Sequence, residues 1–213
     1  MTSLLNALLV IVLLLNLFLL GTSRIRALIQ TAGLQGVILG VMPLLNTAHV
    51  GLMTATVAVA TILVKGSLIP RILFKALRDA QIKREVEPII GFIPSTLLGA
   101  LGTAVAIAMA ARLPMASGQA QTLILPAAFS TIFTGFLLLT SRIKALTQTI
   151  GYLVLENGIF IFGLLLIEAV PFLVELGVLL DLFVGIFVIS IIIHHINREF
   201  ASLDTRRLSA LKE

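Results

Sequence analysis

Residues Leu4 to Leu20 read LLNALLVIVLLLNLFLL, an apolar run that only Asn6 and Asn16 interrupt. A helix of about this length crosses the roughly 30 Å hydrocarbon core of a bilayer. The whole chain of 213 residues is similar in character, with 59% hydrophobic residues, 12% charged residues and a mean hydropathy of +1.14. A soluble core could not bury this much apolar surface, so the sequence predicts an integral membrane protein.

Six further apolar runs follow the first. They lack the alternation of a membrane β-strand and exceed its roughly ten residues, and helices satisfy their own backbone groups in lipid. We therefore predict an all-α bundle of seven transmembrane helices. The approximate bounds are 4–20, 28–45, 50–69, 89–111, 123–139, 148–167 and 170–193. We expect the first helix to be retained, because no basic group precedes it as in a signal peptide.

The basic residues flank these spans mostly on one side. Thirteen of the fifteen Lys and Arg residues lie there, leaving Arg112 on the other side and Lys65 inside a span. By the positive-inside rule this side is cytoplasmic, so we expect the amino terminus outside the cell and the carboxyl terminus in the cytoplasm. We expect the membrane to be the inner membrane of a prokaryote. These charges border a lipid bilayer and have no interleaved aromatic residues, so no nucleic-acid partner is expected.

One phrase occurs twice in the chain. Residues 22–33 read TSRIRALIQTAG and residues 140–151 read TSRIKALTQTIG, with nine of twelve positions identical at an offset of 118. Both copies follow a span that runs inward, which predicts a parallel internal repeat of helices 1–3 and 5–7. The Thr and Ser residues of each copy can cap a helix, and its basic residues can anchor the turn at lipid headgroups.

The repeat suggests four parts of the chain. The first three-helix repeat covers 1–70, a charged connector and helix 4 cover 71–122, the second repeat covers 123–196, and a cytoplasmic tail covers 197–213. We expect the connector over 71–88 to be helical and to lie along the inner membrane surface.

Two acidic residues inside the spans are the main functional candidates. Glu156 lies about 12 Å along its helix from Gln148 at roughly 1.5 Å per residue, and the first copy has Ile38 at this position. A charge at this depth costs on the order of 2.5–3.5 kcal/mol, which makes a proton-transfer role the favoured interpretation. The alternative is a protonated Glu156 that hydrogen-bonds a neighbouring helix. Asp181 lies midway along the last span and could share a proton with Glu156.

Four other polar residues are possible auxiliaries to these acids. Lys65 is expected to snorkel to the cytoplasmic interface, although it could instead pair with a buried acid. Asn157 adjoins Glu156, and Glu175 is either an exit-side acid or a capping group. His194 is expected to be a boundary residue, because no metal-ligand spacing surrounds it.

The sequence contains no catalytic motif. Nucleophile elbow, phosphate loop, HExxH and dinucleotide fingerprint are all missing, and there is no cysteine to ligate a metal or an iron-sulfur cluster. We expect no cofactor in this chain and, if it serves an oxidoreductase, a non-catalytic role.

The run GYLVLENGIFIFGLLL at 151–166, followed by an apolar helix with a central Asp, resembles the hydrogenase-4 component E family over essentially the whole chain. From Gln121 onward the chain is also similar to the small subunit K of complex I and to its counterpart in Mrp-type sodium/proton antiporters. By this resemblance, Glu156 matches the membrane glutamate on the second helix of subunit K, and Asp181 is similar to the glutamate on its third helix.

The resemblance implies a subunit in the membrane arm of a complex I-like, group 4 [NiFe]-hydrogenase-type assembly. The chain would contribute to a lateral proton path and bridge antiporter-like and other membrane-arm subunits. The [NiFe] centre and the Fe-S clusters would belong to cytoplasmic hydrogenase subunits. A stand-alone secondary transporter and a purely structural scaffold are the alternatives.

Overall fold

The computed structural model describes residues 2–46, 51–79, 86–113, 123–166 and 177. Over these residues the chain is helical, apart from its turns and short extended pieces, and the prediction of an all-α protein is confirmed. The elements are α1 (Thr2–Gly21), α2 (Ile25–Asn46), α3 (Leu52–Leu63), the π-helical turn η1 (Val64–Leu68), α4 (Ile69–Asp79), α5 (Phe92–Ala110), α6 (Ile124–Ser141) and α7 (Ala145–Gly163).

Six helices in the described part of the chain are long and apolar enough to cross a membrane, with α3, η1 and α4 together forming one of them. They correspond to the first six predicted spans. The seventh, at 170–193, lies outside the described residues except for Gly177, and the internal repeat stays a prediction.

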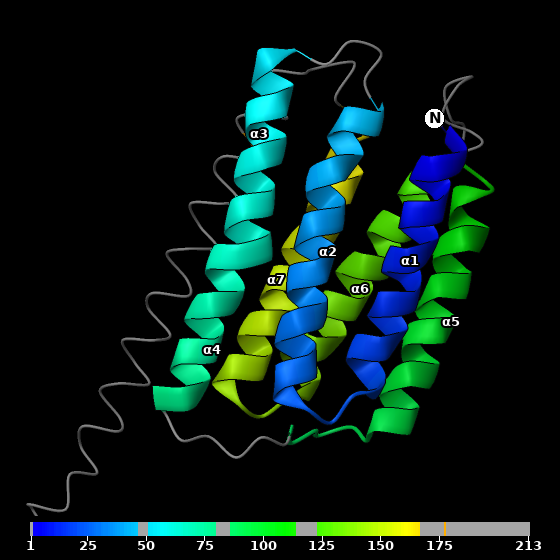
Figure 1. The fold of residues 1–213 in the computed structure, drawn as a ribbon. Coiled ribbons are helices and arrows are strands. Elements are labelled where there is room, and N and C mark those ends of the chain that lie inside the picture. The colour runs from blue at the N-terminus through cyan, green and yellow to red at the C-terminus, as the bar shows by residue number, and fades with distance from the viewer. Residues whose placement is uncertain (1, 47–50, 80–85, 114–122, 167–176, 178–213) are drawn as a thin grey trace, which may run out of the picture.

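The third span is longer than the sequence predicted. Elements α3, η1 and α4 follow one another along one axis (Figure 1), so the apolar helix covers Thr54–Arg78. Residues 71–79 continue this helix, and the expected position of the connector along the inner membrane surface stays a prediction. One face of α4 packs into the core through Leu73 and Leu77, and this burial holds α4 in line with α3.

Pro70 explains why the helix widens between α3 and α4. Proline has no N–H to donate to the carbonyl four residues earlier, and its ring needs space beside that carbonyl, which here belongs to Gly66. The helix accommodates this change with a π-helical turn, in which the Ile69 N–H donates to the Val64 carbonyl. Lys65 lies within this turn, and π-helical turns inside α-helices are frequent at functional sites.

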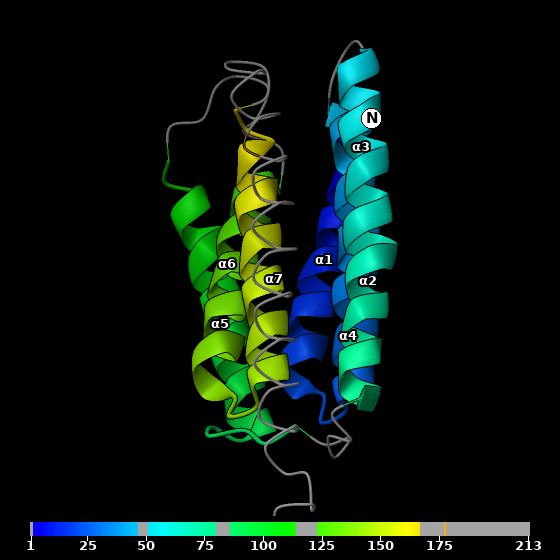
Figure 2. The ribbon, with the colours of Figure 1, turned by 90° about the vertical axis from the view of Figure 1, so that its left-hand side faces the viewer.

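The helices form two layers (Figure 2). One layer contains α5, α6 and α7, and the other contains α1, α2 and the α3–α4 helix. Across the layers, α1 packs on α5 and α6, and α2 packs on α7. Helices α6 and α7 approach especially closely, because a Cβ atom added to Gly135 would lie 2.6 Å from the Leu155 Cα. Small residues at such contacts are the usual basis of close helix packing in membranes.

Helix α1 turns into α2 at the same end of the bundle as α6 turns into α7, and we call it the turn end (Figure 1). The extended segment 86–90 crosses between these two turns. The Val86 N–H donates to the Ser23 carbonyl at 2.8 Å, and the Ile89 N–H donates to the Ser141 carbonyl at 2.8 Å. Ser23 and Ser141 are equivalent positions of the duplicated phrase, so one segment connects both copies.

Arg142 fastens this arrangement from inside. Its side chain is almost fully buried, and its guanidinium donates to the Leu20 carbonyl at 2.9 Å and to the Ile90 carbonyl at 3.4 Å. The guanidinium also lies 5.1 Å from the centre of the Phe92 ring. Burial lowers the pKa of Arg142 from its ordinary value, yet a guanidinium keeps its charge in proteins. Arg24, its counterpart in the first copy, is exposed.

Replacing Arg142 by Ala should therefore destabilise the fold more than the same change at Arg24. We expect Arg142→Ala to lower the free energy of unfolding by about 1.5–3 kcal/mol, the usual contribution of a hydrogen bond to a charged group. Denaturant unfolding in detergent micelles measures the difference, with Arg24→Ala as the matched control. Equal losses in the two variants would contradict the role given to Arg142.

Candidate functional site

A layer of polar side chains separates two apolar clusters of the core. Along α2, residues Ile25 to Ala32 belong to the cluster near the turn end, Ile38 to Met42 belong to the cluster near the other end, and Gln35 lies between them. Helices α1, α6 and α7 show the same order. The buried polar residues of this layer are Asn16, Gln35, Lys65, Thr131, Glu156 and Asn157.

An ion pair lies within this layer. The Lys65 Nζ is 3.9 Å from the Glu156 Oε2, and the two side chains are 5% and 3% exposed. The Lys65 Nζ also lies 5.9 Å from the centre of the Phe160 ring. Because both side chains are buried, each charge interacts with its opposite much more strongly than it would at the surface.

A chain of hydrogen bonds leads away from Lys65 across the bundle. The Lys65 Nζ donates to the Asn157 Oδ1 at 3.4 Å, and the Asn157 Nδ2 donates to the Gln35 Oε1 at 3.4 Å. The Gln35 Nε2 donates to the Asn16 Oδ1 at 2.8 Å, and the Asn16 Nδ2 donates to the Thr131 Oγ1 at 2.9 Å. We call Asn157, Gln35 and Asn16 the carboxamide ladder. It joins α7, α2 and α1 to the lysine, and Thr131 adds α6 at its far end.

The prediction that Lys65 snorkels to the interface is wrong, because Lys65 instead pairs with a buried acid, as the alternative expected. Lys65 packs against Gly36, and a Cβ added there would lie 2.6 Å from the Lys65 Cβ. Gly36 is the twelfth of the 22 residues of α2, so Lys65 lies level with the middle of that helix. The π-helical turn and the missing Cβ of Gly36 together hold it there.

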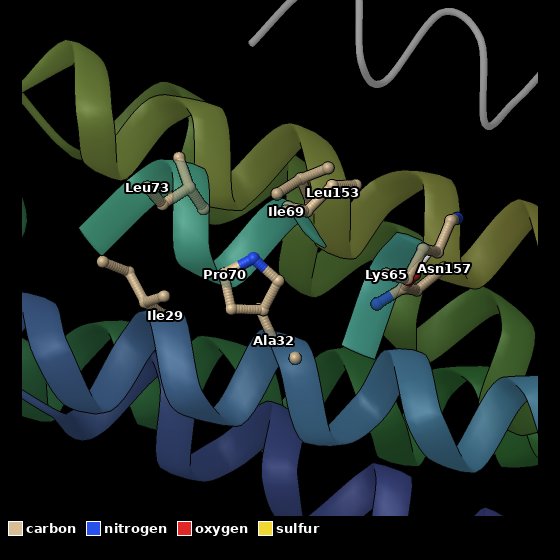
Figure 3. A pocket seen from close by; sticks show the side chains of 9 residues that line it. Ile29, Ala32, Lys65, Ile69, Pro70, Leu73, Leu153 and Asn157 are labelled. Atoms are coloured by element: carbon tan, nitrogen blue, oxygen red, sulfur yellow. Dashed lines mark hydrogen bonds between the residues drawn. The ribbon is translucent and has the colours of Figure 1, made fainter. Parts of the chain in front are cut away.

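A small cavity adjoins the ion pair between α2, α4 and α7 (Figure 3). Its volume is about 10 Å³, enough for the centre of roughly one water molecule. Lys65 and Asn157 supply its polar lining, and the apolar part extends from them towards Leu73 and Ile29 on the side of the turn end. Lys65 is the ionisable group among the residues that line this cavity.

The structure brings together three of the six site residues named from the sequence, namely Lys65, Glu156 and Asn157. Asp181, Glu175 and His194 lie outside the described residues. Sequence reasoning missed the contributions of Asn16, Gln35 and Thr131. The available signal was a carboxamide residue inside an apolar span, as Asn16 is in the run 4–20 and Gln35 is in the run 28–45.

Within the described residues, no group of three or more His, Asp or Glu residues could hold a metal ion. The arrangement of charges instead suits proton exchange or helix association. A buried Lys–Glu pair can be charged or, after proton transfer, neutral, and both states are compatible with an apolar surrounding.

The fold and the site define a polytopic helical membrane protein with a buried ion pair in its polar layer. Over 147 residues the chain is 30% identical to hydrogenase-4 component E of Escherichia coli (strain K12), covering 68% of this chain and 67% of that protein. The same figures hold for hydrogenase-4 component E of Shigella flexneri. The chain belongs to the hydrogenase-4 component E family.

A second relative is the uncharacterized protein Rv0085 of Mycobacterium tuberculosis (strain ATCC 25618 / H37Rv). It is 28% identical over 191 residues, which cover 89% of this chain and 87% of that protein. No protein-family profile and no solved structure matches the chain.

The close contact at Gly36 gives a test of the site geometry. A methyl group at this position would press on the Lys65 backbone and side chain, so we expect Gly36→Ala to lower the stability of the fold by about 1–3 kcal/mol, as overpacking does. Gly51→Ala is the control, because a Cβ there meets nothing within 4 Å. Thermal unfolding in detergent compares the two variants, and an unchanged midpoint for Gly36→Ala would show that α2 and η1 are not this close.

Proposed function

We propose that this chain is a subunit in the membrane arm of a complex I-like, group 4 [NiFe]-hydrogenase-type assembly, where it forms part of a lateral proton path. Membership of the hydrogenase-4 component E family supports the assembly. The observation that carries the proton path is the ion pair of Lys65 and Glu156, buried within the helix bundle. Such charges are expensive inside a membrane and are retained chiefly for function.

The chemistry of the pair is a reversible proton exchange. Glu156 accepts a proton that arrives through neighbouring acids or water, and its neutral carboxyl then no longer attracts Lys65. Lys65 can donate a proton to the next carrier and recover it from Glu156, so the pair passes on a proton without a lasting net charge in the core. The small cavity beside Lys65 and Asn157 supports water as one of these carriers. Asp181 remains our proposal for the partner on the last span.

The rest of the proposal concerns the arrangement of the subunit. The duplicated phrase supports a parallel repeat, and the bias of Lys and Arg supports a cytoplasmic turn end with the amino terminus outside. The exposed apolar face of α5, with Ile93 76% and Leu97 65% exposed, is available to lipid or to an antiporter-like subunit. Electron transfer would take place in cytoplasmic partner subunits that hold the [NiFe] centre and Fe-S clusters.

The proposal is tested by neutralising the acid and measuring the proton coupling, defined as protons moved per electron pair in inverted membrane vesicles. We expect Glu156→Gln to reduce the coupling at least tenfold, because the amide keeps the shape of the side chain but cannot accept a proton. The amount of assembled complex should stay unchanged. Glu87→Gln is the matched control, since Glu87 pairs with Lys144 at 3.0 Å near the surface of the turn end.

Each of the two alternative functions predicts a different result. A purely structural scaffold tolerates Glu156→Gln and Asp181→Asn with full coupling, and this outcome would exclude the proton path. A stand-alone transporter moves a solute in liposomes without partner subunits, and purified protein that does so would exclude an obligatory assembly.

A further inference from the structure

The orientation of the carboxamide ladder is fixed at its far end by Thr131. The Thr131 hydroxyl donates its hydrogen to the Ala127 carbonyl at 2.7 Å, so its oxygen can only accept from Asn16. Asn16 must then present its NH₂ group to Thr131 and its oxygen to Gln35. The same reasoning carried through Gln35 places the NH₂ group of Asn157 towards Gln35 and its oxygen towards Lys65.

The ladder therefore ends in an acceptor that faces the lysine. The Asn157 Oδ1 lies 3.4 Å from the Lys65 Nζ. Each of the three carboxamides directs its oxygen towards the lysine end of the ladder and its NH₂ group towards Thr131. Hydrogen bonds in such a chain polarise one another, which strengthens the acceptor at its end. Carboxamides do not ionise, so the ladder can stabilise a cation without a second negative charge that would compete with Glu156.

Resting on the proposed function, we infer that Thr131 is a positioning residue of the proton site and that the ladder holds the Lys65 ammonium beside Glu156 in both states of the acid. When Glu156 is charged, the ion pair and the ladder act together on Lys65. When Glu156 is neutral, the oxygen of Asn157 still faces the ammonium and keeps it in place for the next exchange. Reversal of the ladder would turn an NH₂ group towards the cation and repel it.

This role differs from that of a structural hydrogen bond between helices. Helix association needs donors and acceptors to be paired, and either orientation of the ladder would satisfy Gln35 and Asn16 equally well. Only the two ends distinguish the orientations: Thr131 sets the orientation at one end, and Lys65 depends on it at the other. Thr131 lies on α6, whereas Lys65 lies in η1 and donates to the ladder at Asn157. The ladder is the chain of hydrogen bonds that connects Thr131 to Lys65.

The test compares two changes at Thr131 in the assembled complex. Thr131→Val keeps the shape but removes the hydroxyl, and we expect it to reduce the proton coupling roughly three- to tenfold, as loss of a buried hydrogen-bond partner does. Thr131→Ser retains the hydroxyl and should restore the coupling to within about twofold of wild type by the same reasoning. Thr103→Val is the control, because its hydroxyl pairs with the Ser130 Oγ at 2.7 Å outside the ladder.

Full coupling in Thr131→Val would overturn the inference, as would an equal loss in Thr131→Ser or in Thr103→Val. If Thr131→Val does not assemble, Gln35→Met interrupts the ladder at its centre and takes its place, with loss of coupling supporting the inference and full coupling overturning it. Glu156→Gln separates the two claims. If it abolishes coupling while Thr131→Val does not, only the ladder is wrong, and if it leaves coupling intact, the proposed function fails.

Discussion

The architecture depends on a single constraint, which is that polar groups without access to water must find partners within the bundle. Lys65 and Glu156 could not both be buried unless opposite charges and hydrogen-bonding groups were brought to the same depth from different helices. The carboxamide ladder extends this requirement to α1, α2, α6 and α7. The two apolar clusters on either side can then pack as ordinary cores, so the polar layer fixes how far each helix can slide along its neighbours.

The backbone features around Lys65 follow from the same requirement. Pro70 widens the helix into a π-helical turn, and Gly36 provides the room for that turn to approach α2. Neither residue carries chemistry itself. Together they turn a lysine, which would otherwise extend towards the interface, into a buried partner of Glu156. At the turn end, Arg142 and the segment 86–90 connect the two copies of the duplicated phrase through hydrogen bonds.

Composition and hydrophobic run length were sufficient to predict a helical membrane protein and six of its spans, because these signals are local. The length of the third span was underestimated, since Arg71 and Lys75 lower the hydropathy of a helix whose other face is buried. Glu156 could be found from the cost of a charge in the membrane. Its pairing with Lys65 could be named only as an alternative to snorkelling, because the direction of the Lys65 side chain depends on a π-helical turn and on contacts between segments about 90 residues apart.

The polar layer lies at positions where the two copies of the sequence differ. At the offset of 118, Gln35 corresponds to Leu153, Asn157 to Leu39 and Glu156 to Ile38, so these three polar positions are ones at which the two copies differ. The copies share their turns and differ in the polar layer. In the polar layer, the second copy of the predicted repeat supplies Glu156 and Asn157, and the first copy supplies Gln35, Asn16 and Lys65.

The most direct measurement is a double-mutant cycle on the stability of the protein with Lys65→Met, Glu156→Gln and the two changes combined. If the two side chains form the buried pair described above, each single change leaves an uncompensated group, and the double change costs less than the sum by on the order of 0.5–3 kcal/mol. Additive losses would mean that Lys65 and Glu156 do not interact, and would contradict the account.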